Sequence, residues 1–211
     1  MGIYLDSAIP SEAEAAVQNG WLSGITTNPT LLAKSGLPAA ETYRRLVQLP
    51  VNEIYYQVPA ADKKTMRGQM YLAEDILGEK LVVKIPPTRE GFAFAAEITA
   101  GHKTCITAVF SPAQALAARA AGADYIAVYV NRASKWMGDG LALTRACAEV
   151  LAGSETEILA ASLKSVDEVV AAFNAGAQHL TLPFEILQAL IEDQYSDRAV
   201  AMFTDGGAHL S

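Results

Sequence analysis

Lys84 lies in the middle of an otherwise apolar run, LVVKIP at residues 81–86. The run is typical of a strand that is buried on both faces. Because burying an unpaired ammonium is costly, a lysine in such a place usually has a lowered pKa and becomes a neutral amine. A neutral amine is a nucleophile that forms a Schiff base with a ketone or an aldehyde. The alternative interpretation is that Lys84 ends its strand and extends its ammonium to water.

Polar side chains also occur at the ends of most other apolar runs in the chain. They are Asp6, Thr26, Asn28, Gln57, Thr107, Tyr129 and Ser162. Each has an ordinary structural explanation when taken alone, since threonines satisfy backbone groups and Asn28-Pro29 is a common helix start. Their convergence around one lysine favours a catalytic role for Lys84.

The reaction that suits these residue types is an aldol reaction. An iminium on Lys84 withdraws electrons from the adjacent carbon of the substrate, so a carbon–carbon bond breaks or forms there. Tyr129 is the candidate acid/base, acting through a water that Gln57 and Thr107 hold. Asp6 and Asn28 are the candidate partners of the substrate hydroxyls.

A second group of residues has the chemistry of a phosphate site. Arg132, Ser162 and Lys164 follow the sixth and seventh apolar runs and supply a guanidinium, a hydroxyl and an ammonium. Barrel enzymes often bind phosphate near their last strands. The alternative is that Arg132 and Lys164 are solvated surface charges.

Eight short runs alternate with Ala-, Leu- and Glu-rich segments that have helical character. The runs are 3–6, 24–27, 53–58, 81–85, 104–109, 125–130, 157–162 and 179–182. Several helical segments begin at a capping serine and end at a glycine: Ser11, Ser111 and Ser165, and Gly20, Gly122 and Gly176. This alternation predicts a single-domain (β/α)8 barrel over residues 1–211, of the TIM-barrel class, with short loops and a C-terminal helix. The alternative fold is an open doubly wound sheet, which no GxGxxG motif supports.

The alternation of side chains along a strand predicts which residues face the barrel interior. Lys84 shares a face with Val82, whereas Val83 and Ile85 suit packing under helices. The residues expected to face inward with Lys84 are Tyr4, Asp6, Thr26, Asn28, Tyr55, Gln57, Cys105, Thr107, Ala127 and Tyr129. The last strand ends at Leu182–Pro183 and offers no polar side chain to this ring.

Composition excludes several classes of function. The net charge of −7, without a basic patch, argues against nucleic acid or an anionic membrane as a partner. The two cysteines and three histidines lack disulfide or metal-ligand spacing, so we expect no metal site and no cofactor. The start of the chain, MGIYLDSAIP, lacks the features of a signal peptide, and no segment is apolar enough to span a membrane. We therefore expect a cytoplasmic protein.

Seven motifs, in order along the chain, resemble the transaldolase family and most closely its small fructose-6-phosphate aldolase branch. They are YLD at 4–6, GITTNPTLL at 24–32, VVKIP at 82–86, TAVFSPAQ at 107–114, YVNR at 129–132, AAS at 160–162 and TLP at 181–183. The resemblance implies a metal-free class I aldolase with the Schiff-base lysine at Lys84. It also implies that Asp6, Asn28, Gln57, Thr107 and Tyr129 surround the reacting carbon and that Arg132 and Ser162 contact phosphate.

Two positions favour the aldolase branch, because transaldolases carry Glu in place of Gln57 and Phe in place of Tyr129. Three departures from the family pattern bear on substrate binding. Lys164 replaces an arginine, Ala127 replaces a serine that contacts the donor, and Trp136 stands where the family has small polar residues.

Three functions remain open from the sequence. The first is an aldolase that cleaves fructose 6-phosphate or adds dihydroxyacetone or hydroxyacetone to aldehydes such as glyceraldehyde 3-phosphate. The second is a transaldolase that transfers a dihydroxyacetone unit between sugar phosphates, and the third is a non-catalytic sugar-phosphate-binding barrel.

The resemblance also implies a ring-based homo-oligomer, with a decamer as one candidate size. The tail at 197–211 is expected to pack on a neighbouring subunit.

Overall fold

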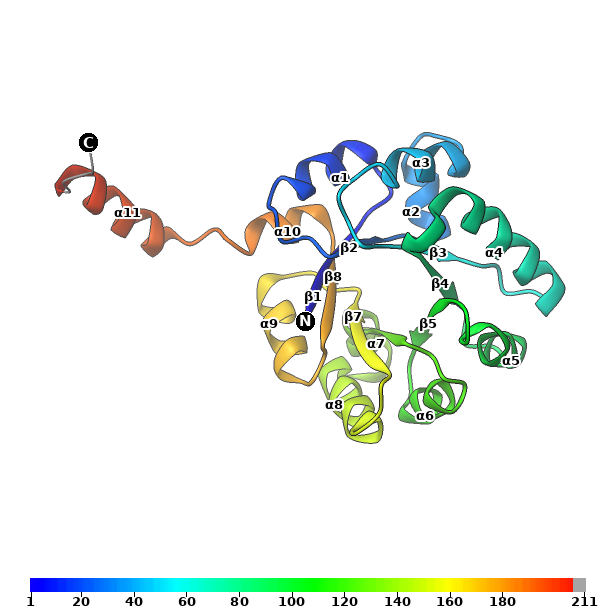
Figure 1. The fold of residues 1–211 in the computed structure, drawn as a ribbon. Helices are drawn as coiled ribbons and strands as arrows, with labels where there is room; N and C mark the ends of the chain where they lie inside the picture. The colour runs from blue at the N-terminus through cyan, green and yellow to red at the C-terminus, as the bar shows by residue number, and fades with distance from the viewer. Residues whose placement is uncertain (207–211) are drawn as a thin grey trace.

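The first and last strands of the chain pair with each other and close a parallel barrel in the computed structural model, which describes residues 1–206 (Figure 1). The strands are β1 (Gly2–Asp6), β2 (Gly24–Thr26), β3 (Glu53–Gln57), β4 (Leu81–Ile85), β5 (Lys103–Val109), β6 (Tyr125–Tyr129), β7 (Glu157–Ala161) and β8 (His179–Leu182). The predicted barrel is confirmed, and each predicted strand differs by at most one residue at either end. The open-sheet alternative is wrong, because β1 pairs with both β2 and β8.

Helices surround the barrel on its outer side (Figure 1). They are α1 (Pro10–Val17), α2 (Pro29–Lys34), α3 (Ala39–Leu46), α4 (Lys63–Leu77), α5 (Arg89–Ile98), α6 (Pro112–Ala120), α7 (Val130–Met137), α8 (Gly140–Leu151), α9 (Val166–Asn174) and α10 (Phe184–Ala189), with a short 3-10 turn at Gly78–Lys80. None of the helices within residues 1–206 is long and apolar enough to cross a membrane.

The capping residues were predicted correctly for two helices and wrongly for one. Ser111 and Ser165 accept hydrogen bonds from the backbone of α6 and α9, as expected. Ser11 is not a cap, because α1 begins one residue earlier at Pro10, whose fixed φ and missing N–H suit the first helical position. The hydroxyl of Ser7 accepts a hydrogen bond from the backbone nitrogen just before this proline, at Ile9.

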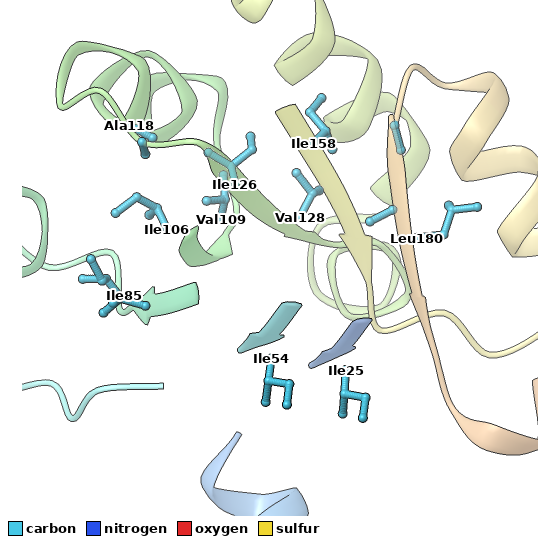
Figure 2. Close-up of a cluster of buried hydrophobic side chains, with 14 of the residues drawn as sticks. Ile25, Ile54, Ile85, Ile106, Val109, Ala118, Ile126, Val128, Ile158 and Leu180 are labelled. Carbon is cyan, nitrogen blue, oxygen red and sulfur yellow. The ribbon is translucent and has the colours of Figure 1, made fainter. Parts of the chain in front are cut away.

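Two separate apolar clusters lie on the two faces of the strands. The outer cluster fills the space between strands and helices, and Figure 2 shows part of it, with side chains such as Ile85 and Ile126 contributed by strands around the barrel. The inner cluster consists of Tyr4, Tyr55, Val82, Cys105, Tyr125, Ala127 and Leu159, with Tyr129 packed against it. Because Val82 belongs to the inner cluster and Val83 to the outer one, Lys84 points into the barrel, as predicted.

The amino-terminal end of the barrel is closed by a buried carboxylate. Glu53 accepts hydrogen bonds from the hydroxyls of Tyr4 at 2.8 Å and Tyr125 at 3.1 Å, and from Lys103 Nζ at 2.5 Å. Burial acts to raise the pKa of Glu53, but the bonds from Lys103 and the tyrosines outweigh it and hold this pKa below its usual value. The same burial, together with the carboxylate of Glu53, raises the pKa of Tyr4 and Tyr125. This end of the barrel is therefore a structural element, remote from the strand ends where the candidate residues collect.

We expect Glu53→Gln to lower the free energy of unfolding at neutral pH by about 1.5–3 kcal/mol, the usual contribution of hydrogen bonds to a charged group. Because the folded pKa is depressed, the stabilisation is complete above the unfolded pKa of about 4.3 and is lost as the pH falls through the folded value. Urea titrations of both proteins between about pH 7 and about pH 3 should therefore show a difference that shrinks on acidification. A constant difference would mean that the charge of Glu53 does not stabilise the fold.

Beyond α10, the helix α11 (Gln194–Gly206) projects away from the ring of helices (red in Figure 1). The predicted C-terminal helix is thus confirmed, although it begins before residue 197. Its exposed side chains include Tyr195, Val200, Met202 and Phe203. Residues 207–211, where the predicted tail ends, lie outside the described part of the chain.

Candidate active site

A cavity of about 510 Å³ opens at the carboxyl ends of the strands. Its lining includes nine of the eleven candidate site residues: Asp6, Asn28, Gln57, Lys84, Thr107, Tyr129, Arg132, Ser162 and Lys164. The candidates that do not line it are Thr26 and Ala127. Residues scattered over nearly 160 positions of the sequence are therefore brought to one cavity by the closure of the barrel.

Lys84 lies on the wall of this cavity and is only 3% exposed. Its Nζ donates a hydrogen bond to the backbone oxygen of Thr27, at 3.1 Å. Within the described residues it forms no ion pair with a carboxylate. Most lysines that are buried for structural reasons are paired with an acid. The carbonyl of Thr27, which sequence reasoning did not assign to the site, orients the amine through this hydrogen bond and carries no formal charge.

Asp6 is held by a chain of hydroxyls that crosses the closure of the barrel. Thr26 Oγ1 donates to Asp6 Oδ1 at 2.9 Å, so the 2.5 Å bond between Thr26 and Thr181 has the Thr181 hydroxyl as its donor. Thr26 is fully buried below the cavity and positions Asp6 instead of facing a ligand. The prediction that the last strand offers nothing polar was wrong, because Thr181 on β8 completes this chain.

Asn28, in the turn after β2, and Gln57, the last residue of β3, both line the cavity. Asn28 Oδ1 accepts from the backbone nitrogen of Leu31 and caps α2, which leaves its amide NH2 group as the donor for a ligand. Gln57 is the partner of Lys84 in the β3–β4 register. Gln57 Oε1 is buried without a hydrogen-bond partner among the described residues. Buried acceptors are nearly always satisfied, so a water or a substrate hydroxyl suits this atom.

Thr107 and Tyr129 form the opposite wall of the cavity and contact each other. Their hydroxyl oxygens are 3.1 Å apart. A bulge in β5 between Ile106 and Val109 inserts one extra residue opposite β6. The bulge places Ala108 in the left-handed region, at φ 53°, and turns Val109 to the outer face, while Thr107 stays at the cavity.

Ala127 and Cys105 face the barrel interior, as the alternation predicted, but both are fully buried beneath the cavity. Ala127 precedes Tyr129 by two residues on β6, so it lies one layer deeper in the barrel than the cavity wall. Burial raises the pKa of the Cys105 thiol to about 12, in spite of the nearby ammonium of Lys84. A thiol in this state is not a competing nucleophile.

Positive charge dominates the cavity although the whole chain is acidic. Lys34, Lys84, Arg132 and Lys164 line it, against the carboxylate of Asp6. Lys34 was missed by sequence reasoning, which sought phosphate ligands only after the last strands. The signal that would have identified Lys34 is its position at the end of α2, a six-residue helix that starts beside Asn28. Such a balance of charge suits an anionic substrate.

The loop after β7 is fixed by hydrogen bonds on both sides of Ser162. The Ser162 carbonyl accepts from the backbone nitrogen of Asn131, and Glu168 accepts from both Asn131 Nδ2 and the backbone nitrogen of Lys164. Ser162 itself has φ 62°, an uncommon conformation for a residue other than glycine. Strain of this kind persists where surrounding structure imposes it, most often at functional sites.

Metal ligands are not clustered in the described part of the chain, where no three His, Cys, Asp or Glu side chains are arranged to hold an ion. The polar groups that line the cavity are amines, a guanidinium, hydroxyls, amides and a carboxylate.

Comparison with known proteins gives one consistent family. A family described as Transaldolase/Fructose-6-phosphate aldolase matches residues 3–208. A probable transaldolase of Hydrogenobaculum sp. is 35% identical over 207 residues, which cover 96% of this chain and 94% of that protein. A probable transaldolase of Aquifex aeolicus is 36% identical over 208 residues, with the same coverage. A crystal structure of a mandelate oxidase variant covers 95% of this chain and 71% of its own, with a TM-score of 0.61 and 16% identity, which indicates a shared fold alone.

Proposed function

The chain belongs to the transaldolase/fructose-6-phosphate aldolase family, and we propose that it is a class I aldolase that reversibly cleaves fructose 6-phosphate to dihydroxyacetone and glyceraldehyde 3-phosphate. Related additions of dihydroxyacetone or hydroxyacetone to other aldehydes would use the same site. The observation that carries this proposal is the buried amine of Lys84, which lies on the cavity wall and, among the described residues, has a backbone carbonyl as its single partner.

The covalent step begins when Lys84 Nζ attacks the C2 carbonyl of the ketose. Loss of water gives an iminium, which accepts the electron pair of the C3–C4 bond as that bond breaks. The proton on the C4 hydroxyl leaves at the same time. The products are an enamine of the three carbons C1–C3 on Lys84 and a free aldehyde of the three carbons C4–C6, which carries the phosphate. Protonation of the enamine at C3 and hydrolysis of the iminium then release dihydroxyacetone and restore the amine.

Tyr129 is the proposed acid/base for these proton transfers. Its hydroxyl is bonded to Thr107, and across the cavity Gln57 supplies a buried acceptor that has no partner within residues 1–206. A water held by Gln57 and Thr107 would link the phenol to the substrate hydroxyl. Asp6, oriented by Thr26, and the amide NH2 group of Asn28 then bind the other hydroxyls of the substrate.

The phosphate group is assigned to the cationic side of the cavity. Arg132, Ser162 and Lys164 line it there, and an arginine fork matches the geometry of phosphate oxygens. Lys34, on α2, adds a third cationic side chain to Arg132 and Lys164 in the lining of the cavity.

The second candidate function is a transaldolase, since the similar proteins from Hydrogenobaculum and Aquifex are named probable transaldolases. Both reactions pass through the same enamine and differ in whether water or a second aldose takes the three-carbon unit. The residues Gln57 and Tyr129, at which the chain resembles the aldolase branch, favour release. An assay for free dihydroxyacetone from fructose 6-phosphate alone, in chelator, separates the two. Turnover that requires an added aldose acceptor would assign the protein to the transferases.

We also propose a ring-based homo-oligomer in which α11 packs on a neighbouring subunit. Deleting residues 197–211 is expected to lower the oligomer mass in light scattering, because the exposed apolar side chains Val200, Met202 and Phe203 are lost. The substitution Arg198→Ala, on the same helix, is the matched control and should leave the mass unchanged. An unchanged mass on deletion, or a monomeric intact chain, would contradict this assembly.

A cytoplasmic location accompanies these proposals. Both cysteines, Cys105 and Cys147, are buried free thiols, which suits a reducing compartment.

A further inference from the structure

Trp136 stands beside the cavity without lining it, and its side chain is 69% exposed. Its indole ring is stacked on the ring of Phe110, with centroids 5.3 Å apart and an angle of 26° between the planes. Phe110 also meets the ring of Tyr129 edge-on, at 5.9 Å. These three rings, Tyr129, Phe110 and Trp136, form a continuous aromatic cluster that begins at the proposed acid/base.

Two rings of this cluster, those of Tyr129 and Trp136, contact the guanidinium of Arg132. The Arg132 Cζ atom lies 5.0 Å from the centroid of the Tyr129 ring and 5.6 Å from that of Trp136. The helical spacing explains this arrangement, because Arg132 and Trp136 are four residues apart on α7 and Tyr129 caps the start of the same helix. Both distances are in the range of favourable cation–π contacts.

Phe110 anchors the cluster to the barrel. Its backbone nitrogen donates to Gln114 Oε1 at 2.8 Å, and its side chain packs against the outer apolar cluster. Trp136 is therefore stacked on a ring whose own position is fixed by β5 and α6, whereas α7 alone would leave the indole free in solvent.

Arg132 has no carboxylate partner within ion-pair distance in the part of the chain that the structure describes. A carboxylate would restrain the guanidinium but would also neutralise it and occupy its N–H donors. Aromatic faces restrain the same group and leave its charge and all its donors available. Aromatic neighbours therefore suit an arginine that binds a phosphate dianion, because they keep the exposed guanidinium ordered and leave it cationic.

We propose that Trp136 is a positioning residue for substrate phosphate: stacked on Phe110, it holds the Arg132 guanidinium at the cavity so that its donors meet the phosphate. This inference rests on the proposed function in one respect, the phosphate group of the substrate. It assigns a role to a residue at which the chain departs from the pattern of its family.

The proposal is tested by comparing the kinetics of aldol addition to a phosphorylated aldehyde and to its unphosphorylated counterpart. Trp136→Ala and Trp136→Leu should raise KM for glyceraldehyde 3-phosphate by roughly three- to tenfold, the size of one or two exposed cation–π contacts, and change kcat little. KM for unphosphorylated glyceraldehyde should stay unchanged. Trp136→Phe, which keeps an aromatic face, should restore most of the loss. In an Arg132→Ala background, Trp136→Ala should have no further effect.

A binding measurement tests the same contact without turnover. The chain has two tryptophans, so the Trp21→Phe variant leaves the emission of Trp136 alone. Titration with inorganic phosphate should change this emission, and Arg132→Ala should abolish the change. Phosphate-dependent emission combined with a failure to trap a Schiff base on Lys84 would refute the proposed reaction and leave this inference intact.

Four kinetic or spectroscopic results would each overturn the inference. They are an equal rise in KM for both acceptors, a Trp136→Leu variant as good as Trp136→Phe, a Trp136→Ala effect that persists without Arg132, and a phosphate-insensitive emission of Trp136. A changed oligomer mass for Trp136→Ala would instead assign the indole to a subunit contact and would also overturn it.

Discussion

Replacing Lys84 with methionine is expected to lower cleavage of fructose 6-phosphate by about 10⁴- to 10⁶-fold, the loss that follows removal of a covalent nucleophile. Methionine has a similar length and no amine, and within residues 1–206 the Lys84 side chain makes a single hydrogen bond, to the carbonyl of Thr27. The variant should therefore fold, and its thermal midpoint should be equal or higher, because an apolar side chain of similar length replaces a buried polar one. Initial rates and thermal melts of the purified variant measure both effects.

Lys80→Met is the matched control for this substitution. Lys80 also donates to backbone carbonyls, those of Val47 and Leu49, but it lies outside the cavity. Its loss should reduce stability and leave the rate unchanged. If Lys84→Met retains cleavage within about tenfold of the intact protein, a lysine-dependent mechanism is excluded.

The second large effect is expected at Tyr129. Tyr129→Phe keeps the ring that packs on Phe110 and Arg132 and removes only the hydroxyl that is bonded to Thr107. Cleavage should fall by about 10²- to 10⁴-fold, the usual contribution of a positioned acid/base. Formation of the Schiff base with dihydroxyacetone should survive. Transfer between sugars should suffer less, since the sequence resemblance implies phenylalanine at this position in transaldolases.

Both rates should be measured on the same Tyr129→Phe preparation, with borohydride trapping of Lys84 as the control for an intact covalent step. Undiminished cleavage with intact trapping would show that Tyr129 is a rim residue. The proton would then have to pass through another group, for which Asp6 is the next candidate because it lines the same cavity.

The strands could be predicted closely because both of their faces are buried. Val82 and Val83 face opposite sides, yet both must be apolar, so the run is visible in sequence without knowledge of its partners. The same alternation correctly placed Lys84 in the interior. The alternation could not give the depth of a residue along the barrel axis. Ala127 was therefore predicted to bind substrate, whereas it is buried one layer beneath the cavity.

Contacts across the closure of the barrel could not be predicted from local pattern. Thr181 reaches Thr26 from 155 residues away, and only the pairing of β1 with β8 brings them together. The stacking of Phe110 on Trp136 has the same character, since it joins the loop between β5 and α6 to helix α7. Arg132 and Trp136 are four residues apart in the sequence, but no helix was predicted there, so their shared face on α7 became visible only in the structure.

Trapping of the covalent intermediate tests the central claim most directly. The intact protein is incubated with dihydroxyacetone in chelator, reduced with borohydride, weighed by mass spectrometry and digested to locate the adduct. The account predicts a gain equal to the mass of dihydroxyacetone less one oxygen atom, carried by Lys84 alone and absent from Lys84→Met. No gain, or a gain on another lysine, would contradict it and would favour a barrel that binds sugar phosphates without a Schiff base on this residue.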